Sequence, residues 1–176
     1  MTDKEFQSAI NLLLKGDKEG LRRIYEAYIR FIYAVVYDTV KRREDAEDIT
    51  SEFFIKLVRV AGTYKKGSPH KAWLATIAKN MAIDALRKNS REVLNANFTG
   101  DDDTENSYMD VKQNENSHET SVEDKVIIAQ DMKRAMETLH EKEREIVNLK
   151  LLGQLKFKEI AEITKQPMGT VTWLYN

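Results

Sequence analysis

The chain has 176 residues, of which 41% are hydrophobic and 32% charged, with a formal net charge of −1; this balance is typical of a folded, helix-rich protein. It contains no cysteine, which excludes disulfides and cysteine-ligated metals, and we find no signal-peptide-like or membrane-spanning apolar run. His70, His118 and His140 are far apart and lack metal-ligand spacing, so we predict surface histidines, no metal or other cofactor, and a cytoplasmic location.

The first forty residues predict two helices. Thr2 to Glu5 forms the T-x-x-E pattern of a capping box before a short run with helical apolar spacing. Gly16 follows that run and predicts its end. Asp17 is a suitable N-cap for a second, longer helix that we expect to reach about Val40.

A third helix is predicted from about Glu44 to Val60, with an apolar stripe facing a core and a charged stripe opposite. Asp48 and Glu52 lie one turn apart on the charged stripe. Paired carboxylates can serve acid–base catalysis or bind a metal, but no histidine or third carboxylate converges on them in the sequence. A docking face for another protein, or a solvated helix face, is favoured over catalysis.

The next stretch is basic. A loop from Gly62 to Ser68 leads into a helix predicted over Lys71 to Lys88, where Ser68 and Pro69 suit the helix start. Seven basic residues and one acid, Asp84, lie between positions 65 and 91. This imbalance suits a polyanion such as nucleic acid, with a solvated helix face as the alternative.

Residues 95–120 are rich in polar side chains and predict a flexible acidic linker. Between 101 and 124 there are nine acidic residues and a single lysine, Lys112. The chain outside this segment is therefore strongly basic, and the overall net charge hides the asymmetry.

The C-terminal third predicts short helices. Two of them, over Phe157–Thr164 and from Pro167 onward, are joined by the tight turn Lys165-Gln166, a pattern that indicates a helix-turn-helix. Many helical hairpins share this pattern and bind no DNA, so the pattern alone leaves the function open.

Three segments in this order resemble the bacterial RNA polymerase sigma factors, in particular the extracytoplasmic-function (ECF) group of the sigma-70 family. They are EDAEDITSEFFIKLVR, KAWLATIAKNMAIDALRK and EREIVNLKLLGQLKFKEIAEITKQPMGTVTWLYN. The resemblance implies an all-α fold of two small helical domains: a region 2 domain over 1–94 and a region 4 helix-turn-helix over 121–176, joined by the linker 95–120.

The resemblance also implies roles for particular residues. The first segment would dock on core RNA polymerase, through Asp45, Asp48, Glu52, Phe53 and Lys56. The second would open and read the minus-ten promoter element, with the loop over 62–71 holding a flipped base. Its expected DNA contacts are Lys65, Lys66, Lys71, Lys79, Asn80, Arg87 and Lys88. The helix-turn-helix would read the minus-thirty-five element with Lys165, Gln166, Thr170, Thr172, Trp173 and Asn176.

The implied function is a sigma factor that directs core polymerase to promoters, with an anti-sigma factor as a possible further partner and no enzymatic activity. The alternatives are a stand-alone helix-turn-helix regulator with an N-terminal sensing domain, and a helical adaptor or an enzyme using Asp48 and Glu52. Lys165, Gln166 and Pro167 depart from the family's usual turn residues. No Lys or Arg occurs between Pro167 and Asn176, so we expect a C-terminally incomplete recognition helix or weak DNA binding by this half.

Overall fold

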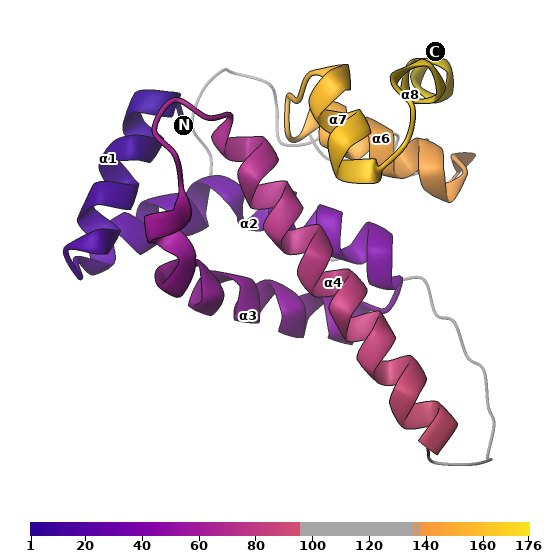
Figure 1. The fold of residues 1–176 in the computed structure, drawn as a ribbon, viewed down its shortest axis with the longest axis horizontal. Coiled ribbons are helices and arrows are strands. Elements are labelled where there is room, and N and C mark those ends of the chain that lie inside the picture. The colour runs from indigo at the N-terminus through magenta and orange to yellow at the C-terminus, as the bar shows by residue number, and fades with distance from the viewer. Residues whose placement is uncertain (96–135, 137) are drawn as a thin grey trace, which may run out of the picture.

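The computed structural model describes residues 1–95, 136 and 138–176, and within them all regular secondary structure is helical (Figure 1). The predicted all-α class is therefore confirmed, while nearly all of the predicted linker lies outside the described residues. The helices are α1 (Asp3–Leu14), α2 (Lys18–Val40), α3 (Arg43–Val60), α4 (His70–Asn95), α6 (Glu141–Leu151), α7 (Phe157–Thr164) and α8 (Met168–Tyr175), with a short 3₁₀ turn at Ala61–Thr63.

Helices α1 to α4 form a bundle around α2, which packs against each of the other three. The helix starts predicted at Thr2 and Asp17 are confirmed: Thr2 forms a capping box with Glu5, and the Asp17 carboxylate accepts the Glu19 backbone N–H at 2.9 Å. Lys41 ends α2 in a left-handed conformation with φ 62°. The apolar stripes predicted from the sequence meet in a common core that includes Phe6, Ile24, Ile32, Phe53, Leu57 and Leu74.

Helices α6 to α8 form a smaller unit that contains the predicted helix-turn-helix. Helix α7 has the predicted bounds, and α8 begins one residue after Pro167. Lys165 joins them in a left-handed conformation with φ 55°, a backbone region that suits glycine best. The turn therefore keeps its left-handed geometry without a glycine, because the Lys165 and Gln166 N–H groups both donate to the Ala161 carbonyl.

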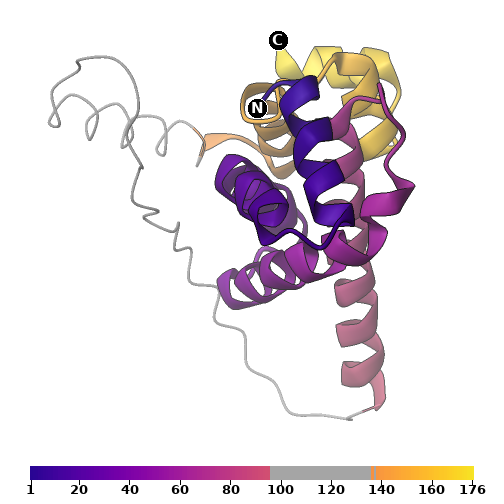
Figure 2. The same cartoon turned by 90° about the vertical axis from the view of Figure 1, so that its left-hand side faces the viewer.

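The two units pack against each other, with α6 on α2 and α7 on α4. Figures 1 and 2 both show α6–α8 over the first half of α4, whose C-terminal end projects away from the bundle. Gly153 lies at this junction, where an added Cβ would approach the Phe31 ring to 2.8 Å and the Leu149 carbonyl to 2.5 Å. Position 153 therefore requires a glycine because neighbouring atoms lie too close for a Cβ. The residue of this turn with a left-handed backbone conformation is the next one, Gln154. Among the described helices, none combines the length and apolar character that a membrane crossing requires.

Candidate functional site

The predicted docking face lies beside a groove between α3 and α4. Asp48 and Glu52 are exposed, and Asp45 is half-buried with its carboxylate 3.4 Å from Arg42. The groove has a volume of about 510 Å³. Its lining comprises Val40, Asp45, Asp48, Ile49, Glu52 and Lys56 on one side and Met81, Asp84, Ala85, Leu86, Lys88 and Asn89 on the other. Within the described part of the chain, no three or more side chains suited to hold a metal lie together.

Phe53 does not belong to this surface. It was predicted in the docking segment, but its side chain is fully buried and packs in the core against Phe54. Its position follows from helical spacing, which places it on the apolar stripe. Ile55 and Val58, by contrast, are 59% and 46% exposed, so α3 offers apolar contact area beside the exposed acids.

The residues predicted to contact minus-ten DNA occupy several separate places. Lys65 and Lys66 are exposed in the loop before α4, and Asn80 is exposed on the helix. Arg87 is also exposed, 3.6 Å from Asp84 one turn earlier. Lys88 lines the groove beside the acidic face of α3, so it lies apart from the loop lysines.

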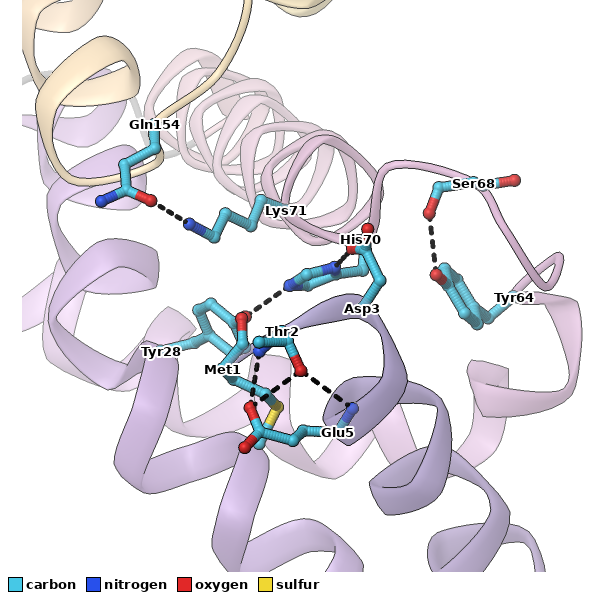
Figure 3. Close-up of polar contacts among 10 residues, drawn as sticks. All are labelled: Met1, Thr2, Asp3, Glu5, Tyr28, Tyr64, Ser68, His70, Lys71 and Gln154. Carbon is cyan, nitrogen blue, oxygen red and sulfur yellow. Dashed lines mark hydrogen bonds and ion pairs between the residues drawn. The ribbon is translucent and has the colours of Figure 1, made fainter.

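The other two predicted DNA contacts lie at the junction between the two units. Lys71 donates to the Gln154 side chain at 2.9 Å (Figure 3). Lys79 pairs with Glu145 of α6, and the two side chains are only 15% and 17% exposed. In this arrangement α6 and the turn after it contact two cations that were predicted to bind DNA.

A second buried polar contact joins the units. Asn148 of α6 donates to the Asp38 carboxylate of α2 at 2.7 Å. Burial raises the pKa of Asp38 to about 6, against the lowering effect of the Asn148 hydrogen bond. Neither residue was predicted from the sequence; the available signal was Asp38 itself, an acid inside the apolar run that ends α2.

The helix-turn-helix exposes a surface without charge on α8. Trp173 is 75% exposed, and Thr170 and Asn176 are exposed too, whereas Val171 is buried against the rest of the unit. The Thr172 hydroxyl donates to the Met168 carbonyl at 2.7 Å. In the turn, Lys165 is exposed and Gln166 is half-buried. Direct readout of bases from this helix would therefore use hydroxyl, amide and aromatic groups.

Two family models match the chain. The model for sigma-70 region 2 matches residues 24–92, and the model for sigma-70 region 4 matches residues 129–172. The chain is 31% identical to the ECF RNA polymerase sigma factor BldN of Streptomyces coelicolor over 90% of its own length, but it spans only 57% of that relative. It is 28% identical to the ECF sigma factor SigW of Bacillus subtilis, covering 92% of this chain and 86% of that one.

Two solved structures have a similar fold. One is the sigma factor RpoE of Bartonella quintana in complex with the anti-sigma factor NepR, with a TM-score of 0.60, 22% identity and coverage of 90% of each chain. The other is CnrH in complex with the cytosolic domain of CnrY, with a TM-score of 0.57, 12% identity and coverage of 97% of this chain and 90% of that chain.

Proposed function

Because this chain belongs to the ECF group of the sigma-70 family, it is a sigma factor, and we propose how its residues divide the work of directing core RNA polymerase to promoters. The acidic face of α3 docks on polymerase. The loop before α4 and the exposed stripe of α4 engage the minus-ten element, and α8 reads the minus-thirty-five element. This promoter recognition takes place in the cytoplasm, where RNA polymerase is located, and this chain catalyses no step of it.

The observation that best supports the docking role is the exposure of Asp48 and Glu52 beside Ile55 on one face of α3. Among the residues that the structure describes, neither acid forms an ion pair, whereas Glu47 on the same helix pairs with Arg43 at 2.8 Å. Exposed acids next to exposed apolar side chains suit a protein partner whose surface is basic at the rim and apolar at the centre.

The minus-ten role requires the two units to separate. While the units are together, the charge of Lys79 is neutralised by Glu145, and Gln154 accepts a hydrogen bond from Lys71 that a phosphate would have to replace. The junction is held partly by polar contacts, which water or phosphate can replace. We therefore propose that binding to polymerase or promoter DNA moves α6–α8 away from α4. An anti-sigma factor, the kind of partner found with the Bartonella quintana RpoE neighbour, would act by favouring a form that cannot bind.

The direct test is binding of the purified chain to core polymerase, followed by run-off transcription from promoters. Asp48→Lys and Glu52→Lys should each weaken binding at least about tenfold, because each places a cation against a basic partner. Glu26→Lys is the matched control, since it makes the same charge change on an exposed part of α2 and should bind as the wild type does. If the well-folded wild-type chain fails to bind polymerase but binds duplex DNA by itself, the sigma role is overturned in favour of a stand-alone regulator.

A further inference from the structure

Helix α1 lies outside the region 2 match, which begins at residue 24, yet side chains of α1, which packs on α2, contact His70 at the start of α4. Its Phe6 is fully buried at the centre of an aromatic cluster. The ring stacks on His70 with centroids 4.5 Å apart, and it meets Tyr64 edge-on at 5.1 Å. Trp73 and Tyr28 complete the cluster at 6.3 and 6.1 Å. Helix α1 therefore contacts both ends of the loop between α3 and α4.

A hydrogen-bonded chain that runs from Asp3 at the surface to the buried His70 and Tyr28 strengthens this contact (Figure 3). His70 Nδ1 lies 2.6 Å from Asp3 Oδ1, and its Nε2 lies 2.5 Å from the Tyr28 hydroxyl. The prediction of a surface histidine is therefore wrong for His70, whose side chain is 5% exposed. Since a carboxylate only accepts, Nδ1–H donates to Asp3, and the neutral ring accepts from Tyr28 at Nε2. Burial lowers the pKa of His70, which agrees with a neutral ring.

The loop itself is closed by two further hydrogen bonds. The Ser68 N–H donates to the Lys65 carbonyl at 3.0 Å, and Gly67 has φ 82°, the geometry of a type II turn. The Tyr64 hydroxyl donates to the Ser68 carbonyl at 2.8 Å. Lys65 and Lys66 are exposed at the tip, so a turn held rigidly from behind presents two cations outward.

We propose that α1 is a brace, and that Asp3, through His70, is a positioning residue which holds the loop over 64–70 ready to capture a base extruded from the minus-ten element. This inference rests on the proposed function. Extruding a base from the duplex costs a few kcal/mol, so a loop that must also be ordered on binding would capture it less efficiently. A brace formed on folding removes that second cost before DNA arrives.

Substitutions at Asp3 test the brace, because its side chain is 77% exposed and its replacement leaves the core intact. Asp3→Asn and Asp3→Ala both remove the charge from the first turn of α1, but only Asn can still accept from His70. Their difference therefore isolates the hydrogen bond from the charge. Amide hydrogen exchange of residues 64–70 should be about tenfold faster in D3A than in wild type, with D3N in between and the melting temperature of the three proteins alike.

Base capture is the functional readout. Promoter duplexes would be selected by the wild-type holoenzyme from a random pool, and each minus-ten base replaced in turn by fluorescent 2-aminopurine. D3A should lower the rate of base extrusion about tenfold, D3N should restore most of it, and Lys4→Ala on the same helix should match wild type. Polymerase affinity should not change in any variant. Phe6→Leu, which removes the ring stacked on His70, should slow extrusion as D3A does.

The outcomes separate the two proposals. If the wild-type holoenzyme selects no promoter, the proposed function fails, whatever the exchange data show. If wild type extrudes a base and D3A does so equally fast, or D3A leaves exchange at 64–70 unchanged, the brace is overturned. Equal slowing of extrusion by D3A and D3N would also overturn the role of the His70 hydrogen bond, because it would assign the effect to charge.

Discussion

The two units of this protein are stabilised in different ways. The unit of α1–α4 has four helices of 12 to 26 residues and most of the buried apolar side chains, whereas α6–α8 has helices of 11, 8 and 8 residues. Isolated helices as short as α7 and α8 are unstable in water, so the small unit depends on packing, part of which comes from α2 and α4. The difference suggests a firm N-terminal platform and a C-terminal unit whose attachment can be changed.

The strongest contrast should come from core truncation in the platform. Leu74 of α4 is fully buried, and Leu74→Ala should lower the free energy of unfolding by about 2–5 kcal/mol, because it leaves a cavity. Urea denaturation followed by circular dichroism measures the loss. Leu86→Ala, on the same helix but 38% exposed, should cost less than about 1 kcal/mol. Equal losses would show that the first half of α4 is not the packed core of the platform.

The same contrast explains what could be predicted from the sequence. The helices of the platform can be predicted from residues that are close together in the sequence. Thr2 and Asp17 mark helix starts, and the apolar spacing of α2 to α4 identifies the side chains that face the core. The bounds of α7 were equally predictable, because a turn at Lys165 followed by Pro167 leaves few alternatives. The spacing of residues along the chain was therefore sufficient to predict structure wherever the interacting residues are close together in the sequence.

The junction was not predictable in this way. Lys79 and Glu145 are 66 positions apart, and Asp38 and Asn148 are 110 apart, so no local pattern connects them. The basic helix taken by itself predicts that Lys79 contacts DNA, and only the fold shows that Lys79 pairs with Glu145. His70 was misjudged for the same reason, because its partner Asp3 lies 67 positions away.

The junction can be measured with a double-mutant cycle on Lys79 and Glu145. Lys79→Met, Glu145→Gln and the double variant should give a coupling of about 1–3 kcal/mol in the free energy of unfolding, because each single change leaves a largely buried charge unpaired. The control cycle uses Arg22 and Glu26, a pair on α2 at 2.8 Å with side chains 60% and 58% exposed, which solvent screens. A coupling at the junction no greater than at this surface pair would contradict a tightly packed junction.

The junction should also strengthen on mild acidification. Folding raises the pKa of Asp38 from 3.8 to about 6, so the folded state binds this proton more tightly. The stabilisation is complete below pH 3.8 and is lost as the pH rises through about 6. Lowering the pH from 7 to 5 should stabilise wild type relative to Asp38→Asn by about 1–1.5 kcal/mol.

The comparison with Asp38→Asn is needed because other groups titrate nearby. Lys41 and Arg144 favour the charged carboxylate, and Glu145 opposes it. His70, in the platform, has a lowered pKa and acts in the reverse direction, since its contribution is lost as the pH falls below 6.5. It is common to both proteins and cancels in the difference. A difference that does not change between pH 7 and pH 5 would show that the Asp38 carboxylate remains solvated.

The smallest effect concerns how the helices of the two units begin. In the platform, the Asp17 side chain caps α2 by accepting the Glu19 N–H, whereas α7 starts without such a cap and relies on Glu159, which accepts the Lys156 N–H at 2.8 Å. Asp17→Ala should lower the free energy of unfolding by about 1 kcal/mol, because a backbone donor loses its partner. Asp17→Asn should cost little, since Asn caps equally well. If both variants lose the same amount of stability in urea denaturation, the charge of Asp17 at the positive end of α2 stabilises the helix more than its hydrogen bond does. The starts of α2 and α7 would then both be stabilised by the negative charge of a carboxylate, Asp17 in one and Glu159 in the other.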